Sequence, residues 1–86
     1  MQIIKISGPA GSGKSVALNR LAQHEGAPVI YADTLMQALP MLMSKATALN
    51  VRTFIDEVTA ADLVKIEQLA KLYPVHYVTY VAGEGI

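Results

Sequence analysis

A run of eight residues near the amino terminus has the composition needed to hold phosphate groups. The run is Gly8, Pro9, Ala10, Gly11, Ser12, Gly13, Lys14 and Ser15. Glycines allow successive backbone amides to point at one anion, and the first turn of a following helix adds unpaired amides and a positive dipole end. Lys14 supplies a mobile cation, and the Ser15 hydroxyl is a ligand for a divalent metal. We therefore expect a phosphate-binding loop that reaches Val16; the alternative is a glycine-rich turn with an accidental lysine.

Two adjacent carboxylates, Asp56 and Glu57, form a second candidate group and follow the strand-like run 53–55. A parallel sheet places this strand end on the same edge as the phosphate loop. We expect Asp56 to hold magnesium, through a water, and Glu57 to orient or deprotonate the water that attacks a γ-phosphate. The alternative is a solvated turn leading into the next helix, whose dipole favours acidic side chains at its start.

The elements that must position these groups alternate short β-branched runs with longer helical stretches, which predicts a parallel sheet with crossover helices. The expected strands are 2–7, 28–32, 51–55 and 75–81, and the expected helices are 14–26, 33–49 and 59–72. Asp33 or Thr34 can cap the second helix, and Pro40 interrupts it, so two short helices are an alternative. Thr59 and Asp62 are spaced as a capping box.

Composition narrows the class of protein. With 86 residues, 52% of them hydrophobic, the chain predicts one domain spanning residues 1–86. Seven basic side chains balance seven acidic ones, so no broad field attracts nucleic acid or an anionic membrane. The absence of cysteine excludes disulfides and thiolate zinc sites. Without a membrane-spanning apolar run or a signal-peptide pattern, a cytoplasmic location is expected.

The loop at 8–15, the run 54–57 and the strand-and-helix unit between them resemble the P-loop NTPase superfamily, in its branch with an additional strand and a catalytic glutamate. The resemblance covers nearly the whole chain. It implies a three-layer α/β/α fold with a four-stranded parallel sheet in the order 1-4-3-2. The chain looks like a minimal core, because most relatives continue past the fourth strand. Arg52 and Thr53 depart from the uninterrupted apolar run that the family has before Asp56.

The same resemblance implies residue roles and ligands. Lys14 and Glu57 take the catalytic positions, Ser15 and Asp56 the metal positions, ATP is the substrate or ligand, and Mg²⁺ is the cofactor. A polar sensor at the end of the fourth strand corresponds to Thr79, although an ordinary β-favouring threonine explains that residue equally well. The acidic run and the last strand also resemble thymidine kinases, whose cysteine zinc module and substrate-binding loop are absent here.

These features predict a magnesium-dependent ATPase domain with slow turnover, acting as an accessory or switch subunit. A kinase for a small, nucleoside-type molecule and a nucleotide-binding module without hydrolysis are the alternatives. Fast hydrolysis needs an arginine finger, and neither Arg20 nor Arg52 is well placed to be one, so we expect a partner or neighbouring subunit to supply it. The first strand should lie at a sheet edge, which favours a homodimer.

Overall fold

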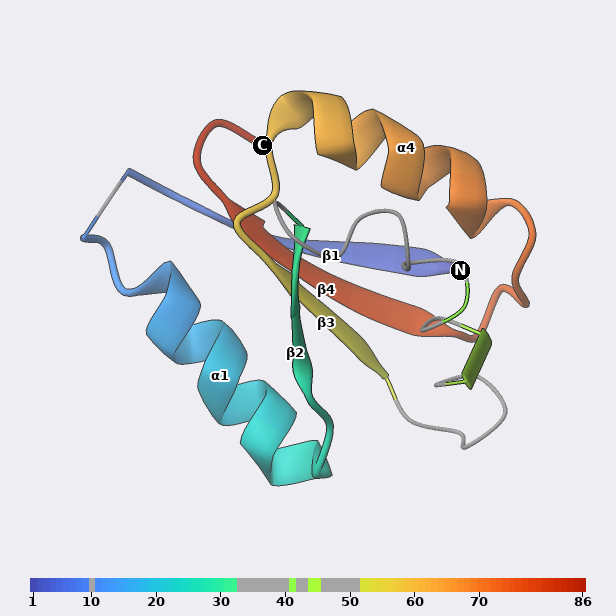
Figure 1. The fold of residues 1–86 in the computed structure, drawn as a ribbon, viewed down its shortest axis with the longest axis horizontal. Helices are drawn as coiled ribbons and strands as arrows, with labels where there is room; N and C mark the ends of the chain where they lie inside the picture. Colours follow the sequence, from blue (N-terminus) through green and yellow to red (C-terminus); the bar gives the residue numbers. More distant parts are fainter. Residues whose placement is uncertain (10, 33–40, 42–43, 46–51) are drawn as a thin grey trace.

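Four parallel strands and two helices make up the α/β fold in the computed structural model, which describes residues 1–9, 11–32, 41, 44–45 and 52–86 (Figure 1). The elements, in chain order, are β1 Gln2–Ser7, α1 Lys14–Glu25, β2 Val29–Tyr31, β3 Thr53–Asp56, α4 Ala60–Ala70 and β4 Val78–Gly83. Within these described ranges, no helix is both long and apolar enough to cross a membrane.

The strand order is β1-β4-β3-β2, as the resemblance implied. The register pairs Ser7 at the end of β1 with Gly83 at the end of β4. It also pairs Tyr31 at the end of β2 with Asp56 at the end of β3. All four strands therefore finish at one edge of the sheet, where the loop into α1 and the segment into α4 both begin.

The core consists of two clusters, each built around one helix. Adjacent residues of β3 belong to different clusters: Ile55 packs with Leu63 and Ile66 of α4, whereas Phe54 packs with Leu18 of α1. Because successive side chains of a strand point to opposite faces, the two clusters lie on opposite faces of the sheet. Figure 1 shows the two helices apart, with the strands between them.

Several predicted boundaries shift for local reasons. The fourth strand begins at Val78 rather than Val75, because the Tyr77 amide donates to the Pro74 carbonyl at 3.0 Å in a turn, and it runs to Gly83 rather than stopping at Val81. The second strand begins after Pro28, which has no amide to donate.

The other boundaries change little, and one predicted element cannot be compared. The third strand begins at Thr53. The helix expected over 59–72 corresponds to α4, which ends at Ala70. A turn follows it, in which the Leu72 amide donates to the Leu69 carbonyl at 2.9 Å. Most of the helix predicted over 33–49 lies outside the described residues, including its cap and Pro40, and so does Val51.

A close backbone crossing joins the segment after β3 to the end of β4. The Val58 amide donates to the Ala82 carbonyl at 3.0 Å. A Cβ added to Gly83 would lie 1.9 Å from the Val58 carbonyl oxygen, much closer than any van der Waals contact. Only a residue without a side chain fits at this crossing, so Gly83 ties the two segments together beside the carboxyl edge of the sheet.

We predict that Gly83→Ala lowers the free energy of unfolding by about 2–3 kcal/mol, because the backbone must move apart to admit a methyl group. Urea denaturation measures this loss. Gly85→Ala is the matched control: its φ of 69° is unfavourable for alanine, but no atom lies near the added Cβ. It should lower the free energy of unfolding by about 1 kcal/mol. Equal losses in the two variants would contradict the crossing.

Candidate phosphate and metal site

The amino terminus of α1 is open. Its N-cap, Gly13, has a φ of 84°, a left-handed conformation that glycine adopts readily, and no side chain caps the helix. The first turn contains no acidic residue. The first helical hydrogen bond runs from the Ala17 amide to the Gly13 carbonyl at 3.0 Å, so the amides of Lys14, Ser15 and Val16 precede the helical ladder. These amides and the helix dipole favour an anion.

The amino terminus of α4, at the same edge of the sheet, is closed by its own side chains. The Thr59 hydroxyl accepts a hydrogen bond from the Asp62 amide, and the Asp62 carboxylate accepts one from the Thr59 amide, both at 3.1 Å. This is the predicted capping box. An anion at this edge therefore finds an uncapped helix start at α1 and a satisfied one at α4.

Two cavities meet at the start of α1. The first, of about 280 Å³, lies over the loop and is lined by Gly11, Gly13, Lys14, Ser15 and Val16. The second, of about 450 Å³, extends from α1 to the start of α4 and is lined by Lys14, Ser15, Asp56, Glu57, Val58, Thr59, Ala60, Gly83 and Glu84. Lys14 and Ser15 line both. The structure thus brings five of the predicted phosphate residues, Gly11, Gly13, Lys14, Ser15 and Val16, beside the predicted acidic pair, whereas Gly8, Pro9 and Ser12 are not among the residues that line these cavities.

Lys14 lies at the junction of the two cavities. Its ammonium donates a hydrogen bond to the Pro9 carbonyl at 3.2 Å, which holds the side chain back over the loop. The Ser12 amide donates to the same carbonyl at 3.2 Å, so it closes the loop on itself. Gly8 precedes this turn and Pro9 begins it, and Ala10 lies outside the described residues.

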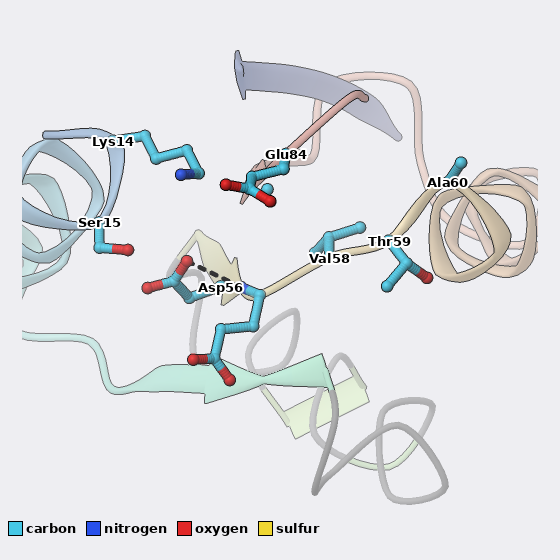
Figure 2. Close-up of a pocket in the computed structure, with 9 residues that line it drawn as sticks. Lys14, Ser15, Asp56, Val58, Thr59, Ala60 and Glu84 are labelled. Atoms are coloured by element: carbon cyan, nitrogen blue, oxygen red, sulfur yellow. Dashed lines mark hydrogen bonds between the residues drawn. The ribbon is translucent and has the colours of Figure 1, made fainter. Parts of the chain in front are cut away.

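Asp56 and Ser15 supply oxygen atoms to the larger cavity. Figure 2 shows the Ser15 hydroxyl directed toward the Asp56 carboxylate. Asp56 is 3% exposed, and its Oδ1 accepts a hydrogen bond from the Glu57 amide at 2.7 Å. Hard oxygen ligands of this kind suit Mg²⁺, which also keeps several waters. In the described ranges no group of three or more His, Asp or Glu is arranged to hold a metal.

Glu57 lines the same cavity in an unusual backbone conformation. Its φ is 56°, and no other non-glycine residue of the described chain has a positive φ. The left-handed region is unfavourable for a residue with a Cβ, and such strain is concentrated at functional sites. The hydrogen bond from its amide to Asp56 helps to hold this conformation.

Thr79 is not brought to this region. It is fully buried, pairs with Ile3 and Thr53 in the sheet, and donates from its hydroxyl to the Met1 Sδ at 2.8 Å. This position lies toward the amino end of β4, whereas the cavity lies beyond the carboxyl end. The strand was expected to end at Val81, which placed Thr79 near its end, whereas β4 continues to Gly83.

The polar residue that follows the end of β4 is Glu84, which the sequence analysis missed. Its side chain is exposed, lines the larger cavity and points toward the Lys14 ammonium (Figure 2). The signal that marks it is its place directly after a parallel strand, at the edge where ligands bind in such sheets. Finding it required the strand end at Gly83.

No arginine is among the residues that line these two cavities. Arg52 instead donates from its guanidinium to the carboxylate of Glu25, the last residue of α1. That pair lies at the opposite end of α1 from the phosphate loop. Arg20 is exposed within α1.

Comparison of the chain with protein-family models, with curated proteins and with solved structures gave no match. The interpretation of the site therefore depends on its residues and geometry.

We predict that Glu57→Gly has a free energy of unfolding about 1 kcal/mol higher than Glu57→Ala, because both variants lose the same carboxylate and only glycine adopts a positive φ without strain. Urea denaturation of the two variants gives the difference. The control pair is Glu67→Gly and Glu67→Ala, at an exposed position within α4, where the glycine variant should be the less stable by about 1 kcal/mol. A Glu57→Gly variant less stable than Glu57→Ala would show that the backbone at Glu57 is not strained.

Proposed function

We propose that this chain is a minimal P-loop ATPase domain of three-layer α/β/α architecture, which binds ATP with Mg²⁺ and hydrolyses it slowly. One observation carries the proposal: the uncapped start of α1, with Lys14 and Ser15, shares a cavity with the acidic pair Asp56 and Glu57. The helices on opposite faces of the sheet and the order β1-β4-β3-β2 agree with this architecture.

The chain's own groups divide the work by position. The amides of the loop from Gly11 to Val16 surround the phosphates, and Lys14 neutralises part of their charge. Ser15 and Asp56 are the residues that would hold Mg²⁺, which when bound offsets the charge of the phosphate chain.

Glu57 is the base in this proposal, because it lines the same cavity as Lys14. It accepts a proton from a water whose oxygen bonds to the γ-phosphorus, while the bond from that phosphorus to the bridging oxygen breaks and ADP leaves.

Slow turnover follows from the placement of the arginines. Stabilisation of the transition-state charge by an arginine raises the rate of phosphoryl transfer by about 10³–10⁵-fold. Arg52 is paired with Glu25 away from the cavities, and Arg20 projects from an exposed position of α1. A partner protein or a neighbouring subunit is therefore the proposed source of an arginine finger, and the domain acts as an accessory or switch subunit.

A direct test compares two substitutions in the cavity. Lys14→Ala should abolish nucleotide binding, whereas Glu57→Gln should retain binding of ATP with Mg²⁺ and lose hydrolysis. A ligand present at a hundred times its Kd adds about 2.7 kcal/mol to stability, which raises the Tm of a domain this small by roughly 10–20 °C. Thermal shifts with and without Mg²⁺ therefore report binding, and phosphate release reports hydrolysis.

Lys65→Ala and Glu67→Gln are the matched controls, because both side chains are exposed on α4 and neither lines the cavities. Both should behave as the unaltered protein. Binding without any hydrolysis to lose would support a nucleotide-binding module, and transfer of phosphate to an added nucleoside would support a kinase. The proposal fails if no nucleoside triphosphate shifts the Tm, or if Lys14→Ala binds normally.

The free edge of the sheet favours self-association. β1 pairs with β4 and ends the sheet, so the backbone groups on its other side have no strand partner within the described chain. Ile4, in the middle of β1, is 41% exposed. We propose a homodimer that pairs the two β1 edges. Sedimentation velocity should show dimer that increases with concentration and decreases in Ile4→Lys; monomer alone at high concentration would contradict it.

A further inference from the structure

The larger cavity is unusual in its charge. Among the described residues that line it, one is basic, Lys14, and three are acidic, Asp56, Glu57 and Glu84. Asp56 and Glu57 have roles in the proposed function, one beside the metal and one beside the attacking water. Glu84 has none. It adds a negative charge at a place where the phosphates of a nucleotide would bring several more.

Backbone contacts fix the position of the chain just before Glu84, beside the cavity. It directly follows Gly83, whose Cα packs so tightly against the Val58 carbonyl that a Cβ would lie 1.9 Å from that oxygen. The neighbouring Ala82 carbonyl accepts the Val58 amide at 3.0 Å. These contacts anchor the end of β4 to the segment that carries Glu57, so the Glu84 side chain starts from a defined point on the rim.

The Glu84 carboxylate faces Lys14 and not a metal-binding group. In Figure 2 it lies across the cavity from α1, directed toward the Lys14 ammonium. The ammonium itself donates a hydrogen bond to the Pro9 carbonyl at 3.2 Å. Among the described residues, Asp56, Glu57 and Glu84 do not form a group of three that could hold a metal. Glu84 brings a further negative charge to this cavity.

We propose that Glu84 makes this site select the metal complex of a nucleoside triphosphate over the free nucleotide. The inference rests on the proposed function. A free triphosphate brings its full negative charge to a lining that is already acidic. The triphosphate and the Glu84 carboxylate repel each other, and both are attracted to the Lys14 ammonium. A divalent cation cancels two of those charges, so the complex meets much weaker repulsion from the same carboxylate. Glu84 is thus a specificity-determining residue of the phosphate site.

The test is calorimetric titration of the whole chain with ATP in excess MgCl₂, and with ATP or inorganic tripolyphosphate in EDTA. The variants are Glu84→Gln, the charge-retaining Glu84→Asp, and Glu67→Gln as a control for charge at an exposed position outside the cavity. Thermal unfolding without ligand verifies that each variant is folded.

Glu84→Gln should lower the Kd for metal-free ATP and for tripolyphosphate about tenfold at low ionic strength, and the Kd for ATP with Mg²⁺ by about threefold or less. The ratio of the Kd for metal-free ATP to the Kd for ATP with Mg²⁺ therefore falls severalfold in this variant. High salt should reduce the difference because it screens the charge. Glu84→Asp should retain most of the preference, and Glu67→Gln all of it.

Three results would overturn the inference. An unchanged preference in Glu84→Gln would show that the charge does not act on the ligand. Weaker binding of ATP with Mg²⁺ in Glu84→Gln, without tighter binding of free ATP, would make Glu84 a ligand of the bound complex instead. Equal effects of Glu84→Gln and Glu67→Gln would show that the preference depends on the net charge of the protein and not on the position of Glu84. Failure of the proposed function is separate, because the unaltered protein would then bind none of the three ligands.

Discussion

The parallel register of the sheet is the constraint on which the site depends. Because β1 pairs with β4 and β4 with β3, all in parallel, the loop after Ser7, the pair Asp56 and Glu57, and the segment after Gly83 leave the sheet at one edge. The three segments are far apart in the chain, and no local interaction could assemble them. A shift of one residue in any of these pairings would move every side chain of that strand to the other face and break up the cavity.

The unpaired amides at the starts of α1 and α4, both at this edge, have different surroundings. Unpaired amides at a helix start must find partners. At α4, Thr59 and Asp62 provide them within the helix, and the result is stability. At α1, the Gly13 N-cap offers no side chain, so the amides remain available to an anion. The two helix starts thus differ in whether a side-chain oxygen already accepts a hydrogen bond from the first amides.

The crossing between Val58 and Gly83 is a second contact that fixes the geometry of the candidate site. It joins the segment that holds Glu57 to the segment that holds Glu84, so the two acidic side chains are placed relative to each other by backbone contacts. The backbone strain at Glu57 lies next to this crossing, where the hydrogen bonds of β4 and of Asp56 can oppose it. The arrangement places three acidic residues and one lysine around the same cavity.

The sequence by itself identified the candidate phosphate loop, the acidic pair and the capping box, because each depends on local spacing. The strand order was implied by the resemblance to P-loop NTPases, and the sheet has that order. Reasoning from the sequence failed where packing between distant segments decided the end of a strand. The turn at Pro74 and the crossing at Gly83 moved β4 toward its carboxyl end, so the polar residue at the edge is Glu84, while Thr79 is buried beneath Met1. Only the tertiary structure decided this, since a strand end set by contacts between distant segments leaves no signal in its own residues.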